Sequence, residues 1–261
     1  MAELVLVGMG LSDERDLTLR AVDELRATPV IYAEMYTSRL APGSLERLGE
    51  ILGRPVQELS REALEAEATI LEALKRSPRV ALLVVGEPFA ATTHVSLRRT
   101  AEAHGHRWRI LHNASILTAA ASLLGLSHYK FGRVVSLPYP TEHHAPTSPY
   151  EAIGANVRAG LHTLVLLDLD PAAARYLTAD HALRRLGEIE RERGEGVLPP
   201  DRDVAVVARA GTPTAQCWYG PRRLLEGRDF GPPLHSVVIP APQLHFVEEE
   251  ALRSWAVPGD G

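Results

Sequence analysis

The sequence predicts an α/β fold of two domains, with a mostly parallel sheet in the first domain and a mixed sheet in the second. Short apolar runs rich in Val and Leu alternate with segments of helical period along the whole chain. One of these runs, "RVALLVVG" at 79–86, is apolar at nearly every position, as in a strand that helices cover on both faces. At 261 residues the chain is also long enough for two domains of ordinary size.

The first elements are expected to form a βαβ unit. "ELVLVG" predicts a strand, "LTLRAVDELRAT" a helix, and "PVIYAE" a second strand. Thr18 is the expected N-cap of the helix, because Leu17 before it and Val22 four residues after it can pack as a hydrophobic staple. Parallel strands joined through a helix indicate a doubly wound sheet.

The rest of the first half continues the alternation. Residues 44–77 are expected to be helical in two or three pieces, with a break near 53–55. After the apolar strand at 79–86 comes a helix that closes at Gly105, in the C′ position, and then the strand "HRWRILH".

The second half alternates less regularly. Four prolines fall within 138–149, as is common in linkers and active-site loops. We predict strands at "HTLVLLDL", "DVAVVARA" and "HSVVIP", and a charged helix that runs to about residue 193. Some antiparallel pairing is expected, because helices do not separate all of these strands, "TAQCWYG" and "HSVVIP" among them, and parallel neighbours need such a crossover. The predicted domains are 1–112 and 113–261.

Composition and charge argue against several classes of protein. The net charge of -5 gives no basic footprint for nucleic acid. Apolar runs are too short to span a membrane, and "MAELVLVGMG" lacks the features of a signal peptide, so a cytoplasmic protein is expected. The single Cys217 excludes an internal disulfide and a multi-thiolate metal site. His143 and His144 lack a third ligand at the usual spacing, so no metal is predicted.

The glycine loop "VGMGLSD" is similar to a dinucleotide fingerprint but does not complete one. Gly8 and Gly10 follow the first strand, whereas the position of the third glycine holds Asp13, an acidic residue where pyrophosphate would bind. Glu34 could take the place of the acidic residue that binds ribose in such fingerprints, yet the glycine pattern that would bind the pyrophosphate is incomplete. The sequence therefore argues against a nicotinamide cofactor, and it contains no Walker loop.

Polar residues also follow the apolar third strand, in "GEPFAATTH" at 86–94. Ligands of open parallel sheets bind at the carboxyl ends of the strands, and the loops at 8–12, 86–92 and 113–116 all lie at such ends. Glu87 could accept hydrogen bonds there, while Pro88 ends the strand. The alternative is that Glu87 only caps a helix that starts at Thr92 or Thr93.

Several motifs together carry a family resemblance: "LVGMGLSDERDLTLRA", "GEPFAATTH", "LHNASILTAA", "HYKFG", "GLHTLVLLDL" and "VVARAG". With them, the chain resembles the diphthine synthase family, a branch of the tetrapyrrole methylase superfamily, from residue 3 to about 250. The resemblance implies two α/β domains of the tetrapyrrole methylase type, a homodimer, and a cofactor cleft between the domains.

The implied reaction is methylation by S-adenosylmethionine, which becomes S-adenosylhomocysteine. The implied acceptor is the amino group of a 3-amino-3-carboxypropyl-histidine on translation elongation factor 2, methylated up to the trimethylated product of diphthamide biosynthesis. Two alternatives stay open: a methyltransferase acting on a tetrapyrrole such as a precorrin or porphyrin, and a non-catalytic nucleotide-binding protein of the same fold.

The resemblance also implies which residues contact the cofactor. Glu87 departs from the family motif Gly-Asp-Pro by one methylene, which puts the reach of its carboxylate in question. His94, His112 and Tyr36 are candidate bases, but no catalytic residue is assigned, and the loop 138–150 is the candidate docking surface for the protein substrate. The implied cofactor contacts are Leu11, Glu87, Ala90, Ser115, Ile116, Leu167, Ala210 and His235.

Overall fold

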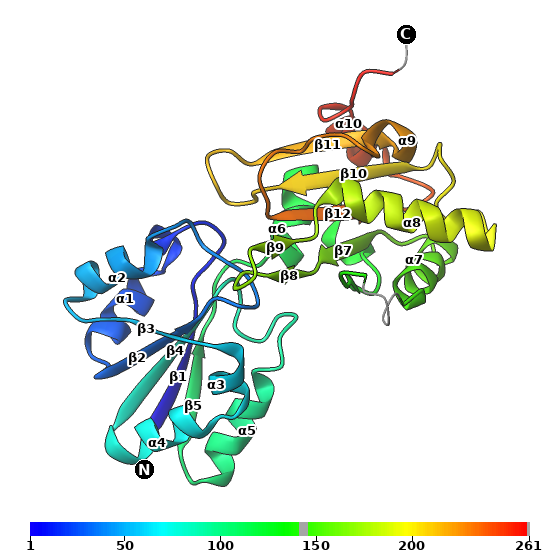
Figure 1. The fold of residues 1–261 in the computed structure, drawn as a ribbon. Coiled ribbons are helices and arrows are strands. Elements are labelled where there is room, and N and C mark those ends of the chain that lie inside the picture. The colour runs from blue at the N-terminus through cyan, green and yellow to red at the C-terminus, as the bar shows by residue number, and fades with distance from the viewer. Residues whose placement is uncertain (141–145, 260–261) are drawn as a thin grey trace. The chain divides into compact units, whose positions relative to one another are not determined.

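The computed structural model describes residues 1–140 and 146–259, which form two compact units with a sheet in each (Figure 1). The first unit contains residues 1–116 and 170–173, and the second contains residues 117–169 and those from 174 onward. The α/β fold, the parallel first sheet and the mixed second sheet are all as predicted.

The sheet of the first unit has five strands, all parallel, in the order β3-β2-β4-β1-β5. The strands are β1 (Glu3–Gly8), β2 (Val30–Glu34), β3 (Gln57–Leu59), β4 (Arg79–Val84) and β5 (Arg107–Leu111). The helices are the 3-10 turn η1 (Glu14–Asp16), α1 (Leu19–Arg26), α2 (Ser44–Leu52), α3 (Arg61–Glu65), α4 (Ala68–Arg76) and α5 (Val95–Ala103).

Each face of this sheet has its own apolar core, because successive side chains of a strand point to opposite faces. Val5 and Val7 of β1 pack with residues of α1 and α2. Leu4 and Leu6 pack with residues of α4 and α5 on the other face. Strands buried on both sides read as continuous apolar runs, which explains the pattern at 79–86.

The strand order places a topological switch between β1 and β4. The connection from β1 through α1 leads to β2 on one side, whereas the connection from β4 through α5 leads past β1 to β5 on the other. The loops that leave these two neighbouring strands therefore diverge to opposite faces. Such a divergence at the carboxyl edge is where open α/β sheets bind their ligands.

Local signals placed most ends of these elements correctly. Thr18 caps α1, its hydroxyl accepting the N–H of Ala21, and Gly105 follows α5 with a φ of +77°. α2 ends at Leu52 with Gly53 as its cap, in agreement with the expected break. The three-residue strand β3 was not predicted, because two of its three residues are exposed and polar at the sheet edge.

The second unit has a five-stranded mixed sheet in the order β11-β10-β12-β7-β6, in which only β6 and β7 are parallel. Its strands are β6 (Val135–Leu137), β7 (Thr163–Leu167), β10 (Asp203–Ala208), β11 (Gln216–Pro221) and β12 (His235–Ile239), and β8 (Leu169–Asp170) pairs separately with β9 (Arg175–Tyr176). The helices are α6 (Ile116–Leu124), the 3-10 turn η2 (His128–Lys130), α7 (Ser148–Arg158), α8 (Ala179–Arg193), α9 (Arg222–Leu225) and α10 (Phe246–Arg253).

The core of the second unit lies between its sheet and the helices α7 and α8, with Tyr150, Leu183 and Leu186 fully buried. α8 ends at Arg193, as the charged segment predicted. The sequence reading did not identify β6, α7 or α10, since β6 is only three residues long and α7 follows directly on the proline-rich segment. Among the described residues, no helix is long and apolar enough to cross a membrane.

Candidate functional site

Three loops meet at the carboxyl edge of the first sheet, following β1, β4 and β5 respectively. The Gly86 N–H donates to the Gly10 carbonyl at 2.7 Å, and the Gly10 N–H donates in return to the Gly86 carbonyl at 3.4 Å. The two loops of the switch point are thus hydrogen-bonded to each other before any ligand is considered.

The two glycines of the first loop are required by close contacts inside the protein. A Cβ on Gly8 would lie 2.6 Å from the Gly86 carbonyl oxygen and 2.7 Å from the Asn113 Cβ. Gly10 has a φ of +75°, and a Cβ there would lie 2.5 Å from the Cβ of Asp16. These glycines therefore allow three loops to approach one another, which differs from the role of glycines in a dinucleotide fingerprint.

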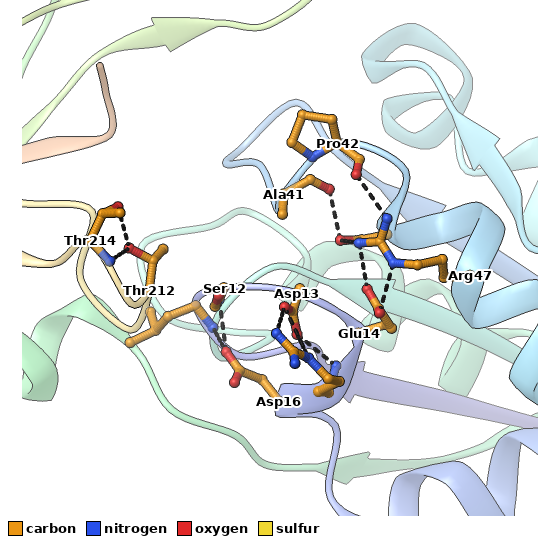
Figure 2. Close-up of polar contacts among 12 residues, drawn as sticks. Ser12, Asp13, Glu14, Asp16, Ala41, Pro42, Arg47, Thr212 and Thr214 are labelled. Atoms are coloured by element: carbon orange, nitrogen blue, oxygen red, sulfur yellow. Dashed lines mark hydrogen bonds and ion pairs between the residues drawn. The ribbon is translucent and has the colours of Figure 1, made fainter. Parts of the chain in front are cut away.

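Asp16 holds the backbone of the first loop. Its Oδ2 accepts the N–H of Leu11 at 2.9 Å and of Ser12 at 2.7 Å, as Figure 2 shows for Ser12. A carboxylate of the chain thus takes the loop amides that an anionic ligand would need. Asp13, which stands in place of the third glycine, caps η1 and pairs with Arg15 at 2.6 Å. The prediction that this is no pyrophosphate loop agrees with the geometry.

A second ion pair supports the same loop from the side of α2. Arg47 donates from Nε and Nη2 to the two carboxylate oxygens of Glu14, at 2.8 and 2.9 Å (Figure 2). The bonds from Arg47 outweigh the opposing effect of burial and lower the pKa of Glu14. Glu14 therefore stays ionised at neutral pH and fixes the segment after the loop.

Glu87 connects the loop after β4 to the loop after β5. Its Oε1 accepts the Nδ1–H of His112 at 2.8 Å, and its Oε2 accepts the N–H of Asn113 at 3.0 Å. The alternative that Glu87 only caps the next helix is therefore wrong. α5 begins at Val95, and the carboxylate reaches in another direction. The Glu side chain is long enough to bridge the two loops.

The loop after β4 is also held from within. Pro88 accepts hydrogen bonds at its carbonyl from Thr92 Oγ1 at 2.8 Å and from Nδ1–H of His94 at 3.3 Å. The Nε2 of His94 then accepts the Tyr36 hydroxyl at 3.4 Å. Burial, together with the charge of Glu34, raises the pKa of Tyr36 to about 12. Two of the three candidate bases, Tyr36 and His94, are therefore engaged in shaping this loop.

The predicted contacts of the first unit fall on these three loops and on the helix that follows. Leu11 lies after β1, Glu87 and Ala90 after β4, Ser115 after β5, and Ile116 is the first residue of α6. Ala90 donates its N–H to the Glu87 carbonyl at 3.0 Å, which closes a turn. Residues distant in sequence are thus gathered at one sheet edge.

The predicted contacts of the second unit also share one edge, that of its own sheet. His235 opens β12 opposite Ala208 of β10, and Ser236 pairs with Leu166 of β7. Because β12 is antiparallel to both neighbours, Leu167 at the end of β7 and Ala210 just beyond β10 lie at the same edge as His235.

His235 is held as a neutral ring. Its Nδ1 accepts the N–H of Ala179 at 3.3 Å, and its Nε2–H donates to the Pro232 carbonyl at 3.1 Å. Burial lowers the pKa of His235, which favours the neutral form that this pattern requires. Leu167 is buried in the same sheet, while Arg209, directly before Ala210, donates to the Phe230 and Pro232 carbonyls. This edge therefore combines a neutral ring and an apolar side chain with a charged side chain held by backbone groups.

The "HYKFG" motif is accounted for by packing within the second unit. Lys130 donates to Oε2 of the buried Glu248 at 2.8 Å, and His162 donates from Nε2 to Oε1 at 3.1 Å. A Cβ on Gly132 would lie 2.3 Å from the Asn156 side-chain oxygen. The motif thus joins η2 to α10 and α7.

Sequence reasoning missed Asp16 and Asn113, two of the three side chains that hold the loops. Asn113 stands directly after a strand, in "LHNAS", where a polar side chain at a carboxyl edge was a usable signal. The described residues contain no group of three or more His, Cys, Asp or Glu that could hold a metal ion. His143 and His144, with part of the docking loop 138–150, lie outside the described residues.

Comparison with known proteins gives agreeing matches over nearly the whole chain. Residues 3–225 match the family model for tetrapyrrole (corrin/porphyrin) methylases. A diphthine synthase from Methanococcus maripaludis is 40% identical over 250 residues, covering 96% of this chain and 97% of the relative. A crystal structure of an Entamoeba histolytica protein has a TM-score of 0.91 at 34% identity and covers 99% of this chain and 100% of its own. A crystal structure of diphthine synthase has a TM-score of 0.87 at 36% identity, with coverages of 98% and 96%.

Proposed function

Because the chain belongs to the diphthine synthase family of the tetrapyrrole methylases, we propose that it methylates the 3-amino-3-carboxypropyl-histidine of translation elongation factor 2 on its amino group, up to the trimethylated product. Enzymes of this family are S-adenosylmethionine-dependent methyltransferases that act in diphthamide biosynthesis. As a member of the family, this chain is such a methyltransferase. The observation that carries the choice of acceptor is the 40% identity to a relative of that name over 96% of the chain.

The cofactor contacts are part of the proposal. Loops at a switch point, and a second edge with the apolar Leu167 and the neutral ring of His235, suit a nucleoside and an amino-acid tail, which need a few polar anchors on a mainly apolar surface. The assignment of the eight residues is supported by their positions: five lie at one edge of the first sheet, and three lie at one edge of the second sheet. They are Leu11, Glu87, Ala90, Ser115, Ile116, Leu167, Ala210 and His235.

S-adenosylmethionine supplies a methyl group on a positively charged sulfur. The lone pair of the acceptor amine forms the new N–C bond. The C–S bond breaks at the same time, and the electron pair of the C–S bond goes to sulfur. The first two transfers each release a proton from nitrogen, and the third leaves a quaternary ammonium. The task of the protein is to align the two groups and exclude water, so no metal is included in the proposal.

The chain offers mainly neutral groups for this task. Tyr36 keeps its proton because its pKa is raised to about 12, and His235 is neutral because burial lowers its pKa. His112 and Glu87 join the loops after β5 and β4 by a hydrogen bond from Nδ1–H to Oε1 at 2.8 Å. We assign no catalytic residue, since alignment of a neutral amine accounts for the reaction without one.

The remaining parts of the proposal concern partners and location. The protein substrate is elongation factor 2, and the enzyme acts as a homodimer in the cytoplasm, without nucleic acid or membrane. The net charge of -5 supports the exclusion of nucleic acid, because phosphate binding requires a basic surface.

The test is mass spectrometry of elongation factor 2 carrying the aminocarboxypropyl histidine, before and after incubation with the protein and S-adenosylmethionine. A gain of three methyl masses on that histidine is expected, with an equivalent yield of S-adenosylhomocysteine. A reaction without the cofactor and one with unmodified elongation factor 2 serve as controls.

Two other outcomes would contradict the proposal in different ways. Methylation of a precorrin or porphyrin, but not of the factor, would show that the acceptor is wrong. Saturable binding of S-adenosylmethionine with no S-adenosylhomocysteine from any acceptor would favour a non-catalytic protein.

A further inference from the structure

Asn113 lies where the three loops of the first unit meet. Its side-chain Nδ2 donates to the Gly8 carbonyl at 2.9 Å and to the Asp16 carbonyl at 3.0 Å. Its backbone N–H donates to Glu87 Oε2 at 3.0 Å. Asn113, in the loop after β5, therefore bonds to the last residue of β1, to Asp16 and to the loop that follows β4.

Both donor hydrogens of this amide are used, and its oxygen also accepts a hydrogen bond. A primary amide has two N–H hydrogens, and each goes to a different backbone carbonyl. The side-chain Oδ1 accepts the N–H of Ala114 at 2.7 Å, which turns the chain toward α6. An aspartate has the same shape but no donor at neutral pH, and its charge would face two carbonyl oxygens.

Through Asp16, the hydrogen bond of Asn113 is connected to the predicted cofactor loop. Asn113 holds the Asp16 backbone, and the Asp16 carboxylate holds the N–H groups of Leu11 and Ser12. Gly8 approaches so closely that an added Cβ would lie 2.7 Å from the Asn113 Cβ. The separation of the loops is therefore set by this amide together with a glycine, with no space for a longer or bulkier group.

We propose that Asn113 is a positioning residue for methyl transfer, whose amide sets the spacing of the loops that carry Leu11, Glu87 and Ser115. This inference rests on the proposed function, since it assigns those loops to the binding of S-adenosylmethionine. Asn113 acts through the loops, by bonds to their backbone and to Glu87, so that the ligand meets a preformed site.

The test compares Asn113→Asp with the wild type by calorimetric titration with S-adenosylmethionine and with S-adenosylhomocysteine. Loss of two neutral hydrogen bonds and the added repulsion are expected to raise the Kd of both ligands about tenfold to a hundredfold. The KM for S-adenosylmethionine is expected to rise in parallel when the factor is the acceptor. A shift in unfolding midpoint alone would be the sign of a merely structural role.

Asn156→Asp is the matched control. Asn156 is a buried asparagine of the second unit whose Nδ2 also donates twice, to the Arg133 carbonyl at 2.8 Å and to Thr163 Oγ1 at 2.9 Å. The same substitution there is expected to lower stability while leaving the Kd within about twofold of the wild type.

If Asn113→Asp fails to fold, Asn113→Ala decides, because it removes the side-chain amide and needs no additional space. A Kd raised severalfold at near wild-type stability supports the proposal. Wild-type affinity in a folded Asn113 variant overturns it while leaving the proposed function intact. A wild-type protein that binds neither ligand overturns the proposed function, and the inference with it.

Discussion

The two sheet edges that carry the predicted cofactor contacts are built by different means. In the first unit, loops that leave three strands are joined by the side chains of Asp16, Glu87 and Asn113. In the second unit, strand register alone places Leu167 and Ala210 beside His235, whose ring nitrogens bond to backbone groups. One edge depends on a few polar atoms and close glycine contacts, and the other on burial and pairing.

This difference decides where single substitutions should act. A loop held by side chains can shift while the sheet stays folded, so changes at the first edge are expected to affect ligand binding. A residue inside a strand register cannot shift alone, so changes at the second edge are expected to affect stability first. The following experiments test that division, in order of decreasing expected effect.

The largest effect is expected from Gly8→Ala. The added methyl would lie 2.6 Å from the Gly86 carbonyl oxygen, and a backbone atom cannot move aside as a flexible side chain can. We expect a loss of about 3 kcal/mol in the free energy of unfolding, measured with urea, and no detectable binding of S-adenosylmethionine.

Gly105→Ala is the control, since Gly105 follows α5 and a Cβ there would meet nothing within 4 Å. Its φ of +77° still makes alanine unfavourable, by about 1 kcal/mol, with binding unchanged. Equal effects of the two substitutions would show that the contact with Gly86 is unimportant.

At the second edge, stability should depend on pH through His235. Burial lowers the pKa of His235 below the ordinary histidine value of about 6.5, so the unfolded chain takes up this proton at a higher pH than the native chain. The contribution to stability is therefore fully present above about pH 6.5 and is lost as the pH falls toward the folded pKa. Burial acts in the same direction on His162, against the opposing effect of Glu248.

We expect the unfolding free energy of the wild type to fall below about pH 6.5, with a slope of at most about 1.4 kcal/mol per pH unit from His235. His235→Gln should make the slope shallower, whereas His104→Gln, at an exposed site, should not. An unchanged slope in His235→Gln would mean that the ring is not neutral in the native state.

A smaller effect is expected from Glu87→Ala, which leaves the Asn113 N–H without its acceptor. The Kd for S-adenosylmethionine should rise about tenfold at nearly unchanged stability. Glu87→Asp, with the residue of the family motif, should bind more tightly than Glu87→Ala. Glu102→Ala is the control, because the Glu102 carboxylate accepts the Nε1–H of Trp108 on an exposed surface. Equal binding by Glu87→Ala and the wild type would remove Glu87 from the site.

The smallest effect is expected from Arg15→Ala. Arg15 is mostly exposed, and its pair with Asp13 lies outside the loop bonds that Asp16 and Asn113 make. Binding of S-adenosylmethionine and the unfolding midpoint should both equal those of the wild type. Weaker binding would show that the charge of Asp13 matters to the ligand, contrary to the division between the two edges.

Much of the fold and the family could be predicted from local patterns. Thr18 and Gly105 are caps whose signals lie within a few residues of the helix ends they determine. The family resemblance carried by the motifs is confirmed by the comparison with known relatives. β3 and β6 could not be predicted, since three residues at a sheet edge give too short a pattern.

The sequence by itself determined the α/β alternation, the longer strands and the family, and it predicts the loops in which a ligand should bind. Only the tertiary structure decided how those loops are held. Asn113 meets the Gly8 carbonyl 105 residues away and the Asp16 carbonyl 97 residues away. His235 is neutral because the fold buries its ring, which lowers its pKa, and its ring nitrogens meet the backbone of Ala179 and Pro232 only in the folded chain. A hydrogen bond requires the distance between donor and acceptor atoms to lie within a few tenths of an ångström of its optimum. For groups so far apart in the chain, only the packed fold sets that distance.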